Sequence, residues 1–465
     1  MVNMSSYSAM VKNENKIFKP TLKIYRQAVA FFIEVALAEW TLFTAMAHSD
    51  ECIAIMEAIA HKTDAHPEPK YDFDGQFPKM PSYIRRAAIK EAVGRVSSYK
   101  SNYARWEATG SGKGRPSLPT AGYCFPCMYK GNMYKESDDP YIAEIKIYDP
   151  KTRQWIWHTI KLHKSDVDYI TKYCSMKEKL SPSLVKRGKM WSLDFSFKEN
   201  VPLHTTDIFE QVILSVDLGI NNACVCTAMA ADGAVHGRHF LKLPVETDRL
   251  DTAINRIKKA QQHGAKRTPR LWAVANGINR DITIKTAKFI MEIAEMYSVD
   301  TIVFEHLDLQ GRKHGPKKQR LALWKARDVQ AMVTHKAHND GMRISRVCAW
   351  GTSRLAFDGS GAVSRGTYMQ DGKEMYNYSI CVFKNGKTYN CDLNAAYNIG
   401  ARYFIREILK SFSEKERLAI EAKVPYAAKR STSTLSTLRN LNAVLCACNG
   451  GPAEPESAPG TRAVA

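Results

Sequence analysis

The sequence lacks the features that mark secreted and membrane-spanning chains. Its opening residues, MVNMSSYSAMVKNENK, do not place a basic segment before an apolar one, so we expect no secretory leader. The apolar run that starts at Ala28 is interrupted by Glu34 and Glu39 and is too short for an unbroken bilayer span. The eleven cysteines show no dense spacing, which favours reduced thiols. We therefore expect a cytoplasmic protein.

Acidic residues are scarce relative to basic ones. Lysine and arginine number 67, aspartate and glutamate 47, and the formal net charge is +20. A charge of this sign attracts polyanions, and nucleic acid is the leading partner that it indicates. Binding to ribosomes or to a membrane surface is the alternative. The 465 residues predict two or three domains, and the apolar fraction of 45% excludes global disorder.

Two early segments, residues 22–47 and 82–107, have helical patterns. The second carries interleaved basic and aromatic residues, namely Arg85, Arg86, Lys90, Arg95, Lys100, Tyr99, Tyr103 and Trp106. Basic groups contact phosphates and aromatic rings stack on unpaired bases, which favours a nucleic-acid surface. An ordinary solvated helix with its aromatic rings in the core explains the pattern equally well.

A linker, ATGSGKGRPSLP, ends this helical region. It is no phosphate-binding loop, because Gly114 stands where a serine or threonine would bind magnesium and the upstream glycine is missing. From about 120 to 206, alternating segments separated by polar turns predict a small antiparallel barrel. Cys124 and Cys127 form a single CxxC, which lacks the second pair that a zinc site needs.

Residues 211–404 follow the chain order of the ribonuclease H fold. Three consecutive strands are expected first, beginning with QVILSVDLGI, followed by helix, strand, helix, strand and a final helix, DLNAAYNIGARYFIREILK. This order predicts an α/β domain. The tail, residues 431–465, is small and polar with a proline-rich end, and we expect it to be disordered.

Three carboxylates occupy related positions in this order. Asp217 lies on the first strand, Glu305 ends the fourth, and Asp392 opens the last helix. The topology places the two strand ends side by side and lays the helix across them. Converging carboxylates repel one another unless cations compensate, and their hard oxygens suit Mg²⁺ or Mn²⁺. Two such ions can hydrolyse a phosphodiester.

Each of these acids has a simpler explanation when taken alone. Asp217 can be a salt-bridged strand end and Asp392 a helix cap, so only their combination with Glu305 predicts a site. Asp308 is interpreted as a solvated loop residue. Asn394 and Asn398 share the helix of Asp392 and either orient ligands or contact backbone.

The motifs VDLGINN, IVFEHLDL and DLNAAYNIG resemble the three parts of the split RuvC nuclease domain in the TnpB family of transposon-encoded RNA-guided DNA endonucleases and the related compact type V CRISPR effectors. The clear resemblance covers residues 207–405. It implies a metal-dependent DNA endonuclease with a guide RNA and target DNA as partners and no membrane. It also implies that Asp217, Glu305 and Asp392 bind two Mg²⁺ or Mn²⁺ ions and cut the DNA.

The sequence pattern and the resemblance together divide the chain into five parts, although the N-terminal half matches the family only in texture. They are a possible first strand of a wedge-like β-barrel (1–21), a helical recognition lobe (22–112), the wedge-like barrel (113–206), the RuvC nuclease domain (207–430, with an insertion at 350–390) and the tail (431–465). Basic residues would line a channel for the guide–target duplex. Those expected to contact nucleic acid are Arg85, Arg86, Lys90, Lys258, Lys259, Arg267, Arg312, Lys313, Lys317 and Lys318.

The insertion departs from the family pattern of two CxxC pairs that bind zinc. Ala356 and Gly359 stand where the first pair of cysteines is expected. In the second pair Cys381 is present, but Lys384 occupies the position of the other cysteine. One thiol cannot make a four-ligand site, so we expect no structural zinc and a hairpin packed around Asn385 and Gly386. Cys348 and Cys391 are possible substitute ligands, but Cys391 would point elsewhere if its segment were a strand.

Other functions compete with the nuclease. A guided DNA-binding protein with weak or no cleavage, acting as a repressor or transposition accessory, is favoured by the degenerate insertion, whereas the three intact acids favour the enzyme. An actin-like ATPase would need a second DxG in a strand–turn–strand setting, which we do not find. A DDE-type strand transferase shares the fold and metals but would lack the wedge-like barrel.

Overall fold

The computed structural model describes residues 1–12, 16–46, 48, 50–109, 114–219, 222–307, 323–370, 372–427, 429 and 431–448. The predictions for Asp308, Arg312, Lys313, Lys317, Lys318 and tail residues 449–465 lie outside the described residues.

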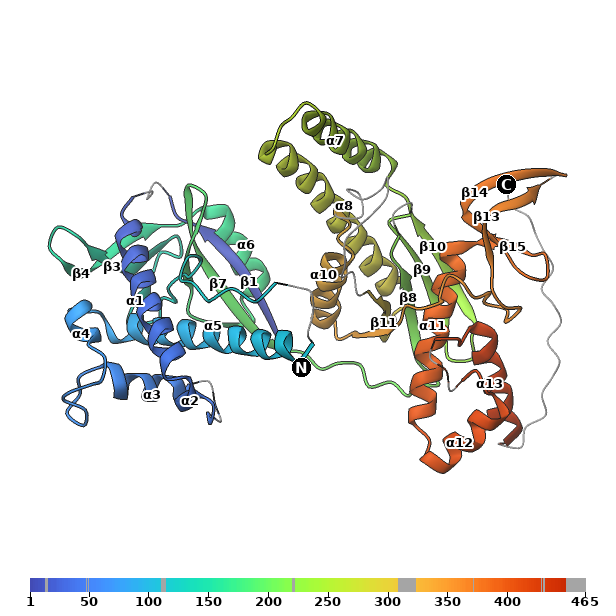
Figure 1. Cartoon of the computed structure of the whole chain (residues 1–465), viewed down its shortest axis with the longest axis horizontal. Coiled ribbons are helices and arrows are strands. Elements are labelled where there is room, and N and C mark those ends of the chain that lie inside the picture. Colours follow the sequence, from blue (N-terminus) through green and yellow to red (C-terminus); the bar gives the residue numbers. More distant parts are fainter. Residues whose placement is uncertain are drawn as a thin grey trace. The chain divides into compact units, whose positions relative to one another are not determined.

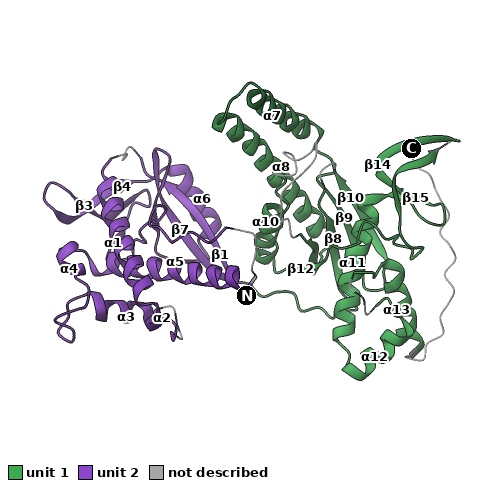
Figure 2. Ribbon diagram, viewed as in Figure 1, with its two compact units in different colours: residues 1, 201–465 green, residues 2–200 purple. Residues whose placement is uncertain are grey.

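The chain forms two compact units, each with its own core. Residues 2–200 make unit 2, and residue 1 with residues 201–465 makes unit 1 (Figure 2). Both units combine helices with sheets, so the predicted mixed α/β multidomain class is confirmed. None of the helices in the described ranges is long and apolar enough to cross a bilayer.

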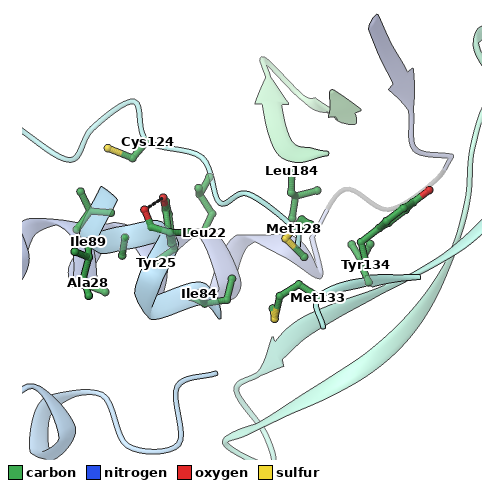
Figure 3. Close-up of a cluster of buried hydrophobic side chains, with 14 of the residues drawn as sticks. Leu22, Tyr25, Ala28, Ile84, Ile89, Cys124, Met128, Met133, Tyr134 and Leu184 are labelled. Carbon is green, nitrogen blue, oxygen red and sulfur yellow. Dashed lines mark hydrogen bonds between the residues drawn. The ribbon is translucent and has the colours of Figure 1, made fainter. Parts of the chain in front are cut away.

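Most helices of unit 2 lie, along the chain, between its first strand and its later strands. Its helices are α1 (Phe18–Ala38), α2 (Trp40–Phe43), α3 (Glu51–Ala60), α4 (Phe73–Gln76), α5 (Ser82–Thr109) and α6 (Lys164–Cys174). Apolar residues recur along α1 at helical spacing, so one stripe of the helix is buried. Figure 3 shows part of the resulting core, where Leu22, Tyr25 and Ala28 of α1 lie near Ile84 and Ile89 of α5.

Cys124 belongs to the same core (Figure 3), and only 1% of it is exposed. Burial raises the pKa of its thiol to about 12. Burial also raises the pKa of Cys127. Both side chains are therefore protonated at neutral pH, and Cys124 packs as a small apolar residue.

The strands of unit 2 form two antiparallel sheets. One contains β1 (Val2–Met10), β5 (Glu178–Lys179), β6 (Ser183–Arg187) and β7 (Met190–Asn200), and the other contains β2 (Tyr134–Glu136), β3 (Ile142–Asp149) and β4 (Gln154–Lys161). The N-terminal strand β1 pairs with β7 from end to end. The predicted antiparallel strands are confirmed, but the closed barrel is wrong, because the two sheets are joined only by isolated bridges among the described residues, such as Val11 with Leu162.

Unit 1 is built on a five-stranded sheet. Across the sheet the strands are β10 (Val235–Leu241), β9 (Cys224–Ala230), β8 (Val212–Asp217), β11 (Thr301–His306) and β12 (Arg343–Cys348). The first three along the chain are antiparallel, and β11 runs parallel to both β8 and β12. Strands and helices therefore follow one another in the order predicted for residues 211–404.

Helices cover both faces of this sheet (Figure 1). One face carries α11 (Cys391–Lys410) and α13 (Leu435–Cys448), the other α8 (Pro269–Met296) and α10 (Ala326–Asn339), and unit 1 also contains α7 (Pro244–Gln262) and α12 (Glu414–Lys423). Neighbouring residues of β8, Ile213 and Leu214, point into the two opposite cores, as strand geometry requires. Gly400 lets α11 approach closely, because a Cβ there would lie 3.2 Å from the Ser215 hydroxyl.

The structure can be compared with the predictions for the insertion at 350–390 and for the tail from residue 431. The insertion forms a small sheet of β13 (Ser364–Gln370), β14 (Lys373–Val382) and β15 (Thr388–Asn390). The predicted disorder from residue 431 is wrong for α13, which buries Leu435, Leu438 and Leu441 in the core that α11 shares. The polar composition of this segment concealed a leucine stripe that only packing makes stable.

Candidate active site

The ends of two parallel strands bring the first two acids together. Asp217 is the last residue of β8, and Glu305 is the next-to-last residue of β11. The register sets Phe304 opposite Val216, so the two acids follow in neighbouring positions at the same sheet edge. Asp392 comes from the first turn of α11, which packs on β8 and β9.

A helix cap holds Asp392 in place. The side-chain oxygen of Asn390, the N-cap of α11, accepts hydrogen bonds of 3.0 Å from the backbone N–H groups of Asp392 and Leu393. Such caps satisfy donors that have no partner within the helix. The cap explains why the helix begins where it does, and it frees the Asp392 side chain from the capping role.

The electrostatics of Asp217 show that the three acids share one environment. Burial raises its pKa well above the usual value, and the charges of Glu305 and Asp392 raise it further. Arg365, on β13, acts in the opposite direction. Glu305 also has a raised pKa because it is buried, although a hydrogen bond from Thr352 and the charge of Arg402 oppose that rise. The acids thus form a half-buried group in which like charges oppose one another.

Two neutral side chains contact the acids directly. The Asn222 amide donates to Asp392 Oδ2 at 2.6 Å, and the Thr352 hydroxyl donates to Glu305 Oε1 at 2.5 Å. Sequence analysis did not assign either residue to the site, although Asn222 closes the VDLGINN motif and Thr352 lies in the Gly351–Ser353 turn. The available signal for Asn222 was its place five residues after the strand-end carboxylate Asp217, in the same motif. Thr352 had no local signal, because its partner is 47 residues away in the chain.

The donor chemistry fits a divalent cation. Carboxylate oxygens are the ligands that Mg²⁺ and Mn²⁺ prefer, and a cation would relieve the repulsion that raises the pKa of Asp217. Within the described ranges, however, no three acidic, histidine or cysteine side chains are gathered closely enough to hold a metal ion as they stand. The three acids are close enough for their charges to interact. To bind a common ion, the side chains of Asp217, Glu305 and Asp392 would have to turn toward it.

The insertion beside the site has an apolar core of its own. Ala356, Cys381, Phe383 and Cys391 are buried together, and Phe357 packs against them. Cys391 therefore points toward Cys381, unlike the orientation expected for a strand, because it is the first residue of α11. A hairpin turn is present at the predicted Asn385–Gly386 position, where Gly386 has φ +82° and the Phe383 N–H donates to the Lys387 carbonyl.

The basic residues predicted to contact nucleic acid differ between the two units. Arg85 is 8% exposed and donates twice to Glu57 Oε1, at 2.9 and 3.1 Å, so α3 and α5 use it as an internal ion pair. Arg86 lies 3.5 Å from the same carboxylate, and Lys90 lies 2.6 Å from Asp50. On unit 1, by contrast, Lys259 and Arg267 are exposed and Lys258 is half-buried.

Comparison with known proteins gives partial matches to this chain. The family model Aq_aa04 matches residues 5–149. The TnpB-like protein aq_aa05 of Aquifex aeolicus (strain VF5) is 27% identical over 245 residues, which is 47% of this chain and 76% of that protein. The uncharacterised protein aq_aa04 of the same organism is 30% identical over 113 residues, which is 23% of this chain and 63% of that protein.

Comparison with solved structures gives low-identity matches to proteins of the CRISPR systems. The Cas12f1–sgRNA–target DNA complex has a TM-score of 0.48 at 13% identity and covers 74% of each chain. The mini-RNA-guided endonuclease CRISPR-Cas_phi3 has a TM-score of 0.47 at 8% identity and covers 84% of this chain and 92% of its own. The identity to a TnpB-like protein over 47% of this chain supports a relationship to the TnpB family, which the motifs VDLGINN, IVFEHLDL and DLNAAYNIG had indicated.

Proposed function

We propose that this protein is a divalent-metal-dependent DNA endonuclease of the transposon-associated TnpB type, directed by a guide RNA. The observation that carries the proposal is the group of Asp217, Glu305 and Asp392, which are half-buried at one sheet edge, where the charges of Glu305 and Asp392 raise the pKa of Asp217. A group of acids with raised pKa values is typical of functional sites.

In the proposed reaction, the three carboxylates hold Mg²⁺ or Mn²⁺. When bound there, such ions would supply positive charge for the phosphate and acidify a water molecule. Asn222 orients the Asp392 carboxylate, and Asn390 holds the first turn of α11 that carries it. Arg365 supplies positive charge near Asp217.

The guide RNA and target DNA are proposed as partners on two grounds. The chain has a net charge of +20, and exposed basic residues such as Lys259 and Arg267 lie on unit 1. The resemblance to TnpB proteins adds that sequence specificity would come from base pairing, with the protein contributing phosphate contacts.

The decisive experiment combines RNA capture with cleavage. The protein is purified with its bound RNA, the RNA is sequenced, and plasmids that match it are incubated with Mg²⁺ and either wild-type protein, Asp217→Ala or Asp248→Ala. Asp248 is an exposed acid of α7 and serves as the matched control. We expect a discrete RNA and cleavage by the wild type and the Asp248 variant alone.

Two other outcomes have clear meanings. Enrichment of one RNA together with sequence-specific DNA binding but no cleavage would support the guided DNA-binding alternative, which the residues Ala356, Gly359 and Lys384 at the positions of zinc ligands favour. If no RNA is enriched, the guided function is wrong.

A further inference from the structure

Helix α11 carries a buried polar stripe on the side that faces the turn after β12. Asn394, Asn398 and Arg402 are spaced four residues apart, so they lie on one face of the helix. Their exposed fractions are 0%, 0% and 4%. Burying an amide or a guanidinium costs free energy unless hydrogen bonds replace those to water, so partners for all three are required.

The two asparagines hold the backbone of residues 352–357. Asn394 donates to the Leu355 carbonyl at 2.9 Å and accepts from the Phe357 N–H at 2.8 Å. Asn398 donates to the carbonyls of Thr352 and Leu355, both at 2.8 Å. The short segment after β12 is therefore attached to α11 at several backbone groups, and its path follows the helix.

Arg402 anchors the chain just before that segment and also just before α13. Its guanidinium donates to the carbonyls of Cys348 and Trp350 at 2.7 and 2.8 Å. It also donates to the carbonyls of Ser431 and Ser433, which precede α13, at 2.8 and 3.1 Å. The rigid fork of an arginine suits this multiple contact, and a lysine could not reproduce it.

The segment held in this way presents one hydroxyl to the acid group. Thr352 is 2% exposed, and its hydroxyl lies 2.5 Å from Glu305 Oε1 and 3.0 Å from the Ala349 carbonyl. A hydroxyl has a single proton to donate, and an ionised carboxylate is the stronger acceptor. Thr352 therefore fixes the orientation of the Glu305 carboxylate.

We propose that Thr352 is a positioning residue for Glu305, and that the stripe of Asn394, Asn398 and Arg402 exists to hold Thr352 in place. The inference rests on the proposed function, since it gives Glu305 a role as a metal ligand. Substitution of a residue that orients a metal ligand through a hydrogen bond typically lowers metal affinity or activity by about 10- to 100-fold.

The central test compares two substitutions of one residue. Thr352→Val keeps the shape of the side chain and removes the hydroxyl, whereas Thr352→Ser keeps the hydroxyl. Mn²⁺ binding is measured by titration calorimetry, and DNA cleavage is measured under single-turnover conditions. We expect Thr352→Val to weaken Mn²⁺ binding and slow cleavage by about 10- to 100-fold, and Thr352→Ser to restore both to within a few-fold of the wild type.

A matched pair on α11 tests the stripe. Asn398→Ala should weaken Mn²⁺ binding and increase amide hydrogen exchange in residues 351–357. Arg406→Gln is the control, because Arg406 lies one further step of four along the helix but contacts the Arg346 carbonyl and Ser345 on β12. We expect the control to change neither measurement. If Asn398→Ala fails to fold, the Thr352 pair still decides the role of the hydroxyl.

The outcomes separate this inference from the proposed function. If the wild type binds Mn²⁺ and Thr352→Val weakens the binding but no protein cuts DNA, positioning stands and the nuclease proposal fails. If the wild type cuts DNA while Thr352→Val equals it in affinity and rate, or if Thr352→Ser is as impaired as Thr352→Val, the positioning role is wrong. A wild type that neither binds Mn²⁺ nor cuts overturns both.

Discussion

Half-buried acids have opposite surroundings in the two units. In unit 2, Glu57 receives two hydrogen bonds from Arg85, and Asp194 is paired with Arg187. These pairs cross between helices or between strands, and they neutralise the charge that folding buries. Acids of this kind have a structural explanation.

In unit 1, Asp217 has two other acids as its main charged neighbours. Glu305 and Asp392 raise its pKa in addition to burial, and Arg365 opposes them only in part. Burial also works to raise the pKa of Asp194 in unit 2, yet the hydrogen bonds from Arg187, Ser8 and Ser192 bring it below the usual value. Pairing lowers the pKa of Asp194 and so favours its charged form, whereas the group around Asp217 disfavours the charged form, and acid groups of that kind are typical of functional sites.

The largest expected effect is the loss of chemistry in Asp217→Asn without loss of fold. Cleavage should fall by about a thousandfold or more, because several kcal/mol of transition-state stabilisation depend on the metal ligands. The melting temperature at pH 7 should stay constant or rise, since a buried and repelled charge has been removed. Single-turnover cleavage and thermal unfolding check the two parts, and a destabilised variant would contradict the comparison.

Arg85→Met, in contrast, should lower the stability of unit 2. It leaves Glu57 buried beside Arg86 alone, and we expect unit 2 to lose roughly 3 kcal/mol of its free energy of unfolding in urea. Adding Glu57→Leu should recover most of that loss, because the uncompensated charge is then gone. A double variant as unstable as the single one would mean that packing, not charge, explains the effect.

The paired acids should make unit 2 sensitive to acid. Because the pKa of folded Asp194 lies below its unfolded value, its contribution is fully present above the unfolded pKa, at about pH 4. It is lost as the pH falls through the folded pKa. Arg187→Gln should lower the free energy of unfolding at pH 7 by about 1 kcal/mol and flatten its dependence on pH below 4. Urea unfolding at several pH values measures both effects. If the variant keeps the wild-type dependence of the unfolding free energy on pH below 4, the pair does not cause the acid sensitivity.

The smallest expected effect concerns basic residues that serve binding instead of folding. Replacing both Lys258 and Lys259 with glutamine should leave stability unchanged and weaken RNA binding. The slope of log affinity against log salt should fall by about 2, one for each lost phosphate contact. Lys288→Gln is the control, because Lys288 is an exposed residue of α8 that already pairs with Glu292. Equal slopes for all three proteins would exclude these lysines from the nucleic-acid surface.

Much of unit 1 was predictable because its signals are local. Alternating or continuous apolar runs predicted β8, β9 and β11, and the amphipathic pattern predicted α11. A carboxylate at the end of an apolar strand is conspicuous in any sequence, so Asp217 and Glu305 could be named before their neighbours were known. Predictions failed where composition was the only guide, as for α13, and where strand pairing had to be chosen, as for the barrel.

The sequence by itself determined the order of elements and the identity of the three acids, since these depend on periodicity and on residues that stand out against an apolar background. Only the tertiary structure decided which charges are balanced. Arg85 looks the same in the sequence as a phosphate-binding arginine, and Thr352 looks like any turn residue. Their roles depend on Glu57 and Glu305, which lie 28 and 47 residues away, and contacts over such separations are set by packing.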